Sequence, residues 1–309
     1  MSYEGKMLEA LKMPHRKEVE KELLKALFKH NGVIKEFSSG EEIVDEIAED
    51  FRLNVKQRTA YLETKYLKEN RIKKSSLWHR LLFRAADSLA KEKLISRPTH
   101  TFKITNKKEW MLTEAGFDKS LKLFNIPTKQ KNDLPIKSFE VQKIVKKLNE
   151  ASRPENYNPV DKKKKIIKKT KETTLRWRGF RQAIIEAYDS SCTVCGMKIC
   201  SPDAFLWEVE AAHIVPHRAF GKDDIWNGLA LCHLHHWAFD VGWFTLSDSY
   251  KIQVSSKANS LPPNFGKMDN YNFLESLSTK RSRILLPSRV NIYPHRNSIS
   301  WHRQNIFQK

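Results

Sequence analysis

The chain has 309 residues, enough for two domains, and 40% of them are hydrophobic, so folded cores are expected. Its 56 Lys and Arg against 36 Asp and Glu give a formal net charge of +20. This surplus indicates a polyanionic partner, most often nucleic acid, although the charge could also serve solubility alone. No apolar run approaches the roughly 18 residues of a membrane span, no signal peptide is evident, and four cysteines do not make a disulfide scaffold. These features predict a cytoplasmic protein with no membrane partner.

Helical periodicity dominates the first part of the chain. Residues 15–30 carry apolar side chains at helical spacing, and a second helix follows with Ser39 as its N-cap. A third helix is expected after Ser75 and Ser76. Its buried stripe would consist of Trp78, Leu82, Ala85 and Leu89.

Two further stretches complete this region. Residues 55–74 are expected to be helical with basic loops. Residues 94–116 read as two strands around a basic loop. Helices followed by a basic hairpin predict a winged helix-turn-helix, in which one helix enters the major groove of DNA and the wing contacts the backbone. The alternative is a small helical domain that binds another protein.

The segments SLWHRLLFRAADSLAKEKLI and EWMLTEAG resemble the amino-terminal winged-helix domain of Mrr-type restriction proteins. The resemblance covers roughly residues 15–125 and implies a DNA-recognition domain, which we expect over residues 1–125. The side chains expected to contact DNA, some of them only at phosphates, are Arg80, Arg84, Lys103, Lys107 and Lys108.

Residues 126–175 are expected to be a Lys-rich linker. Seven of the eleven residues from Asp161 to Lys171 are lysines. Such a segment can separate two domains, and it can also hold DNA through non-specific phosphate contacts.

The second domain, residues 176–309, contains two pairs of potential metal ligands. Cys192 and Cys195 form a CxxC pair, and Cys232 and His235 form a CxxH pair 36 residues later. Three thiolates and one imidazole make a closed tetrahedral site that suits Zn²⁺, so we expect a structural zinc. Cys200 is left over as a loop or packing residue.

His236, the neighbour of the expected zinc ligand His235, indicates a second ion. Adjacent residues on a helix lie about 100° apart, so His235 and His236 cannot easily serve one ion. Asp240 lies one turn beyond His236 on the same helical face. This pair could hold a hard divalent cation, Mg²⁺ or Mn²⁺, with open positions for a phosphate.

The order around these residues is strand, loop, strand and helix, with the motifs A-H-I-x-P and N-G-L-x-L-C-x-x-H-H-x-x-F-D-x-G over residues 178–246. This pattern resembles the HNH nuclease family, which has the ββα-metal fold. The resemblance implies that His213 is the general base, Asn227 the middle Asn and His236 the metal-binding histidine.

One position departs from the family pattern. Many members carry Asp or His directly before the base histidine as a second metal ligand, whereas this chain has Ala212. Asp240 is the expected substitute. Glu210 is a weaker candidate, because residues three apart on a strand point to opposite faces.

Together these features predict an α+β protein with a winged helix-turn-helix domain and a zinc-stapled ββα-metal domain. The expected function is a prokaryotic restriction endonuclease that acts on double-stranded DNA, as a homodimer for double-strand cleavage. The Mrr-like domain favours modified DNA, with N6-methyladenine ahead of modified cytosine. The alternatives are a sequence-specific restriction enzyme, a homing or phage endonuclease, and a non-catalytic DNA-binding regulator.

Overall fold

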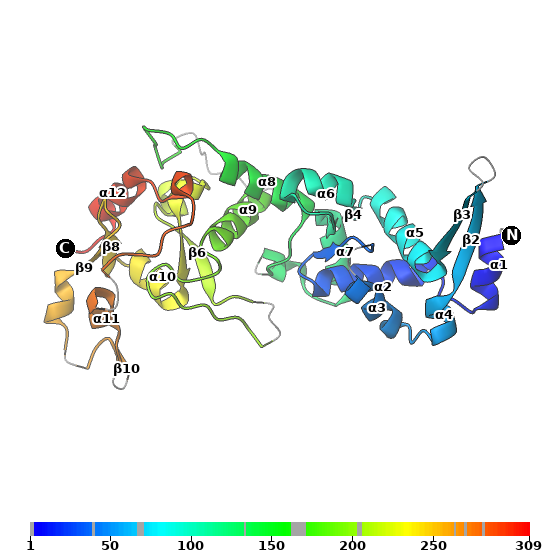
Figure 1. Cartoon of the computed structure of the whole chain (residues 1–309). Helices are drawn as coiled ribbons and strands as arrows, with labels where there is room; N and C mark the ends of the chain where they lie inside the picture. The colour runs from blue at the N-terminus through cyan, green and yellow to red at the C-terminus, as the bar shows by residue number, and fades with distance from the viewer. Residues whose placement is uncertain are drawn as a thin grey trace. The chain divides into compact units, whose positions relative to one another are not determined.

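The computed structural model divides the chain into two compact units, Met1–Lys143 and Ile144–Lys309 (Figure 1). The described residues are 3–38, 41–66, 71–132, 134–161, 171–202, 206–262, 264–268, 271–279 and 282–309. The lysines between 162 and 169, which the sequence places in a linker, lie outside the described residues.

The first unit combines helices with a small antiparallel sheet. Its helices are α1 (Tyr3–Ala10), α2 (Arg16–Lys29), α3 (Glu41–Asp50), α4 (Val55–Thr59), α5 (Leu77–Lys91), α6 (Pro98–Thr105), α7 (Glu114–Leu123) and the start of α8 (Phe139–Glu150). The sheet has the order β1 (Val33–Lys35), β5 (Glu109–Leu112), β4 (Ile95–Ser96). Strand β5 is therefore central, although it comes last in the sequence.

Helix α5 packs into the core of this unit through the predicted stripe. Trp78, Leu82, Ala85 and Leu89 are all buried. The indole nitrogen of Trp78 donates a hydrogen bond to the Val44 carbonyl at 3.1 Å, which ties α5 to α3. The apolar periodicity of this segment thus correctly identified its buried face.

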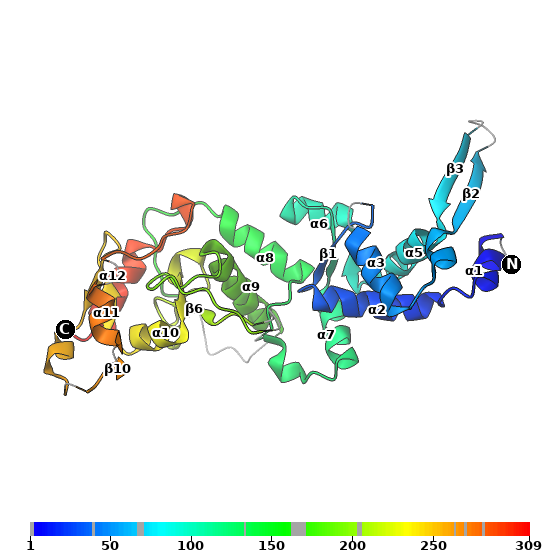
Figure 2. The same ribbon diagram turned by 60° about the horizontal axis from the view of Figure 1, so that its bottom comes forward.

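The prediction for residues 55–74 is wrong over most of their length. Only Val55–Thr59 is helical, and β2 (Tyr61–Tyr66) pairs antiparallel with β3 (Arg71–Ser76). This hairpin projects away from α5 in both Figure 1 and Figure 2. Tyr61, Thr64 and Tyr66 are residue types that favour strands, and this preference prevails over helix propensity in YLETKY.

The predicted strands in residues 94–116 are present, but the connection between them is not a loop. Ile95 pairs with Leu112 and Ser96 with Met111, as an antiparallel hairpin requires. The residues between them form α6, which has Pro98 at its first position. Proline at that position needs no N–H partner and has a preset helical φ, so it starts a helix rather than breaking one.

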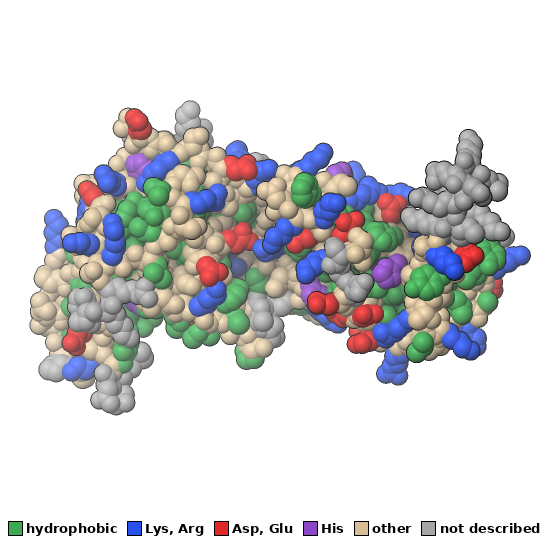
Figure 3. Space-filling view, viewed as in Figure 1, with side chains coloured by type: hydrophobic (Ala, Val, Ile, Leu, Met, Phe, Trp, Pro, Cys, Tyr) green, Lys and Arg blue, Asp and Glu red, His purple; other side chains and the backbone are tan. Residues whose placement is uncertain are grey.

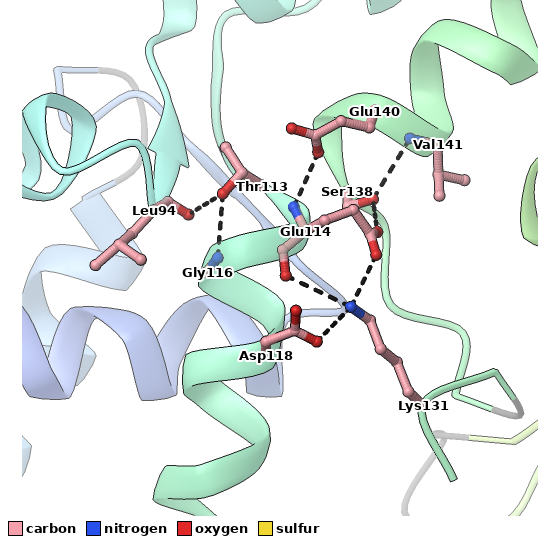
Figure 4. A network of polar contacts seen from close by, with 9 residues as sticks. All are labelled: Leu94, Thr113, Glu114, Gly116, Asp118, Lys131, Ser138, Glu140 and Val141. Carbon is pink, nitrogen blue, oxygen red and sulfur yellow. Dashed lines mark hydrogen bonds and ion pairs between the residues drawn. The ribbon is translucent and has the colours of Figure 1, made fainter. Parts of the chain in front are cut away.

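A polar network fixes the region after this sheet (Figure 4). Lys131, in the 3-10 helix η2 (Thr128–Asn132), forms ion pairs with Glu114 at 2.8 Å and Asp118 at 2.5 Å. Glu114 also accepts a hydrogen bond from the Ser138 hydroxyl at 2.5 Å. Residues in the first part of the expected linker are therefore held against α7, and α8 occupies a further part of it.

The second unit contains the ββα arrangement expected from the sequence pattern. Strand β6 (Val209–His213) pairs antiparallel with β7 (Gly228–Cys232), and α10 (His233–Asp240) follows β7 without a loop. Helix α9 (Lys171–Ala187) and α10 both contact β6 (Figure 1). The remaining elements are η3 (His217–Ala219), η4 (Ile225–Asn227), β8 (Phe244–Leu246), β9 (Ile252–Val254), η5 (Ser256–Ser260), β10 (Lys267–Met268), β11 (Tyr271–Asn272), α11 (Phe273–Thr279), η6 (Val290–Ile292) and α12 (Arg296–Asn305).

Within the part of the chain that the structure describes, no helix combines the length and the apolar character needed to cross a membrane.

Substitution of Thr113 tests the hydrogen bonds at the start of α7. Its hydroxyl donates to the Lys93 carbonyl at 2.6 Å and accepts from the Gly116 N–H at 3.1 Å. Thr113→Val keeps the shape and removes both bonds, so we expect the first unit to lose about 1–2 kcal/mol of stability in urea unfolding. Thr59→Val, at an exposed position, should change it by less than about 0.5 kcal/mol. Equal effects of the two substitutions would contradict this role of Thr113.

Candidate metal centre and active site

The four predicted zinc ligands lie together. Ligand atoms of Cys192, Cys195, Cys232 and His235 are all within 4.8 Å of one another. The His235 Nδ1 atom is 2.9 Å from the Cys232 sulfur and 3.7 Å from the Cys192 sulfur. Cys200 is exposed and does not belong to this group.

Local structure explains how the two pairs meet. The first pair lies in a turn after α9, closed by a hydrogen bond from the Gly196 N–H to the Cys192 carbonyl, and Gly196 has a φ of +79°. The Thr193 N–H donates to the Ala230 carbonyl, which joins this turn to β7. Cys232 ends β7 and His235 lies in the first turn of α10. A cation here would connect the end of α9 to the start of α10.

The chemistry of this group fits zinc. A hydrogen bond from Cys195 lowers the pKa of the Cys192 thiol, which favours the thiolate form. Burial opposes a charge on His235, but the Cys192 and Cys195 sulfurs raise its pKa to about 9. Three sulfurs and one imidazole gathered in this way match the closed donor set of a structural zinc.

The second histidine of the pair, His236, belongs to a different cluster. Its Nδ1 atom is 3.0 Å from a Glu210 oxygen, and its Nε2 atom is 3.6 Å from an Asp240 oxygen. Asp240 therefore lies where the helical spacing predicted, one turn from His236. Glu210 lies closer to the ring than Asp240 does, although the sequence favoured Asp240.

Glu210 also bears on the departure at Ala212. The two residues lie two apart on β6, so their side chains leave the same face of the strand. Ala212 is fully buried, whereas the longer Glu210 side chain reaches the α10 histidines. A carboxylate thus faces His236 from β6 despite the alanine.

The charges in this cluster are coupled. A hydrogen bond with His236 lowers the pKa of Glu210, and burial opposes this effect. Burial also opposes a charge on His236, but Glu210 and Asp240 together raise the pKa of its imidazole. Burial raises the pKa of Asp240, whereas the charges of His236, Arg218 and His213 oppose that shift. Asp240 therefore lies in a field shared by His236 and His213.

His213, at the end of β6, is held on two sides. Its Nε2 atom is 3.0 Å from an Asp223 oxygen, and the two side chains are only 11% and 13% exposed. The Phe180 ring of α9 stacks on the imidazole at a centroid distance of 4.1 Å and an interplanar angle of 18°. Sequence reasoning did not identify Asp223, because loop residues carry no periodicity that indicates where they point.

Asn227 is fully buried and holds the loop between β6 and β7. Its amide oxygen accepts from the Val215 N–H, and its amide nitrogen donates to the carbonyls of Val215 and Lys222. Gly221 makes this possible, because a Cβ there would lie 1.8 Å from the Val215 carbonyl oxygen. These contacts fix the loop between β6 and β7.

The residues expected to contact DNA lie in the first unit. Lys103, Lys107 and Lys108 are exposed on α6 and in the turn after it. Arg80 and Arg84, on α5, both bond to the same Glu4 oxygen, at 2.8 and 2.6 Å. Glu4, in α1, is almost fully buried, so an internal carboxylate holds the two guanidinium groups.

Comparison with known proteins identifies the domain. Residues 192–247 match a family model described as HNH endonuclease. The chain contains an HNH endonuclease domain. The matched segment includes both ligand pairs, His213 and His236.

A solved structure titled "Modification dependent TagI restriction endonuclease" is similar to the chain with a TM-score of 0.28 and 21% identity. The similarity covers 41% of this chain and 37% of that one, so it spans well under half the length of either. Among curated proteins, none matches the chain.

The metal content of the HNH domain can be tested at Cys232. Cys232→Ser removes a thiolate from the closed donor set, so bound zinc should fall from about one ion per chain to well below half an ion. Elemental analysis of the purified protein measures this directly. Cys200→Ser, a matched change outside the cluster, should leave zinc unchanged. Zinc retained in the first variant would show that the ion binds elsewhere.

Proposed function

We propose that the protein is a metal-dependent DNA endonuclease of restriction type. The observation that carries the proposal is the His213–Asp223 pair within an HNH domain, in which His213 ends the strand that also carries Glu210, the carboxylate facing His236. The net charge of +20 supports a polyanionic substrate. Lys and Arg side chains lie on both units in Figure 3, interspersed with carboxylates.

In this mechanism His213 is the general base. Asp223 accepts the hydrogen bond from Nε2–H, which leaves Nδ1 to take a proton from the attacking water. The Asp223 carboxylate then stabilises the imidazolium that forms, and Phe180 keeps the ring in its plane. Asn227 is a positioning residue, because its bond to the Lys222 carbonyl fixes the loop next to Asp223.

His236 and Asp240 would hold the catalytic cation, Mg²⁺ or Mn²⁺, on the Nε2 side of the ring. Glu210 accepts from Nδ1–H, which fixes the tautomer that leaves Nε2 available for a metal. When bound, the cation would stabilise negative charge on the phosphate and on the leaving oxygen. The Cys₃His cluster would hold a structural Zn²⁺.

The first unit would read the DNA as a winged helix. The order α2, β1, α3, α5, β4, β5 supports this, with α4 and the β2–β3 hairpin inserted before α5 and α6 inserted between β4 and β5, as does the sheet order β1–β5–β4. In this arrangement α5 is the recognition helix and α6 lies within the wing. The proposed organisation is a recognition domain over 1–125, a basic connecting segment over 126–175 and a nuclease domain over 176–309.

The resemblance to Mrr-type domains favours modified DNA as the substrate, with N6-methyladenine ahead of modified cytosine. A double-strand break requires two active sites, which a symmetric homodimer supplies. The competing proposal, a sequence-specific enzyme for unmodified DNA, uses the same nuclease residues and differs only in what the first unit reads.

Plasmid cleavage tests the proposed activity. Matched plasmids from methylating and non-methylating hosts are incubated with Mg²⁺ or Mn²⁺ and with wild-type protein or His213→Ala. We expect cleavage of the methylated plasmid only, reduced about 10²- to 10⁴-fold in the variant because the general base is lost. DNA binding in a gel-shift assay should be retained by the variant. Equal cleavage of both plasmids would exclude modification dependence, and full activity of His213→Ala would exclude the mechanism.

Removal of Asp223 should lower the cleavage rate, whereas removal of Asp240 should raise the Mg²⁺ concentration that cleavage needs. Asp223→Asn should lower the cleavage rate about 10- to 100-fold, the range for partners that orient a functional histidine, without changing the Mg²⁺ concentration for half-maximal rate. Asp240→Asn should raise that concentration about tenfold or more. Asp224→Asn is the matched control, because Asp224 accepts from the Tyr157 hydroxyl rather than from His213. A changed Mg²⁺ requirement in Asp223→Asn would make Asp223 a metal ligand instead.

A further inference from the structure

The first unit contains a hollow of about 780 Å³ between the outer face of α5, the start of α6 and β5. Its lining includes Phe83, Arg84 and Lys91 of α5, Arg97 and Trp110. This volume is within the range of small-molecule sites, which is about 300–1,000 Å³. The hollow is remote in sequence from the HNH domain and has no part in the mechanism above.

An aromatic ring forms one wall of the hollow. Phe83 is 37% exposed, and its ring is held in place by neighbouring rings. Its ring meets buried Phe37 edge-on at 5.0 Å, and Phe37 in turn stacks on Trp110 at 5.7 Å. Phe83 therefore exposes part of its ring to the hollow, and its contact with Phe37 fixes the position of the ring.

Positive charge surrounds this ring. Four Lys and Arg side chains and two carboxylates line the hollow, and two of these cations also pair with carboxylates outside the lining, Arg84 with Glu4 and Arg16 with Glu20. One of the lining carboxylates, Asp87, accepts from Nε and Nη2 of Arg97 at 3.2 and 2.6 Å and pairs with Lys91 at 2.9 Å. Asp87 thus holds two cations at the rim of the hollow, where an anionic group of a ligand could join them.

We infer that this hollow binds a single nucleotide, with its base against Phe83 and its phosphate among Arg84, Lys91 and Arg97. A planar base uses the aromatic wall, and a phosphate can join cations that carboxylates already hold in place. An apolar ligand would leave the cations unused. An extended phosphate backbone would leave the aromatic wall unused.

Two sources supply this ligand chemistry. One is a nucleotide of a DNA strand whose base has left the stack. The other is a free nucleotide that binds as a small-molecule effector. Only the DNA source rests on the proposed function, because it requires the first unit to engage DNA.

The test is calorimetric titration of the full-length protein with 5′-dAMP, deoxyadenosine and inorganic phosphate. We expect 5′-dAMP to bind at least about tenfold more tightly than either of the others, since it alone engages both the ring and the cations. Phe83→Leu, which keeps apolar bulk, should weaken 5′-dAMP binding about tenfold, and Phe83→Trp should preserve it. Lys91→Gln should weaken binding of 5′-dAMP but not of deoxyadenosine.

Phe102 provides the matched control. It is 47% exposed in the same unit and does not line the hollow, so Phe102→Leu should leave binding unchanged. Unchanged affinity in Phe83→Leu, or an equal loss in Phe102→Leu, would overturn the inference. A second result would also overturn it. In that result 5′-dAMP does not bind, and Phe83→Leu does not change the binding of a single-stranded oligonucleotide.

Competition separates the sources. Displacement of 5′-dAMP by the oligonucleotide assigns the site to a DNA strand, and a lack of displacement assigns it to a free nucleotide. No arm of the test depends on cleavage, and His213→Ala should bind 5′-dAMP as the wild type does. Failure of the nuclease mechanism and failure of this inference are therefore distinguishable.

Discussion

The direct passage from β7 into α10 is the constraint on which the second unit depends. Because no loop separates Cys232 from His233, the helix begins at the metal cluster and its first turn carries His235 into that cluster. The next residue, His236, is rotated by about 100° and faces β6 instead. Two adjacent histidines thereby serve two clusters, and any shift in the start of α10 would disturb both.

The cluster around His236 and the pair at His213 both draw a residue from β6, and the charge of His213 reaches Asp240 in the His236 cluster. Glu210 reaches α10, whereas His213 lies between Phe180 of α9 and Asp223 of the loop. Gly228 lets α9 pack closely here, since a Cβ would lie 2.3 Å from an Ile184 methyl carbon. The proposed base is thus fixed by a rigid helix on one side and by an Asn227-bound loop on the other.

Several cationic side chains of the first unit are held by carboxylates, unlike those of a simple basic surface. Two arginines on the exposed side of α5 are bound by Glu4, and Arg97 is bound by Asp87. A polyanion that approaches this face meets cations already oriented by carboxylates. Such an arrangement favours a ligand that fits between defined groups over one that needs only a positive field.

The sequence by itself determined the features that depend on short spacing. The CxxC and CxxH pairs, the His236–Asp240 turn and the buried stripe of α5 follow from local spacing, and the HNH match covers the first two of these features. Only the tertiary structure decided the rest. Asp223 meets His213 across a loop, Glu210 reaches His236 from another element, and Glu4 meets Arg80 across 76 residues. These contacts depend on how separate elements pack, and no periodicity within one segment encodes the direction of a side chain in another.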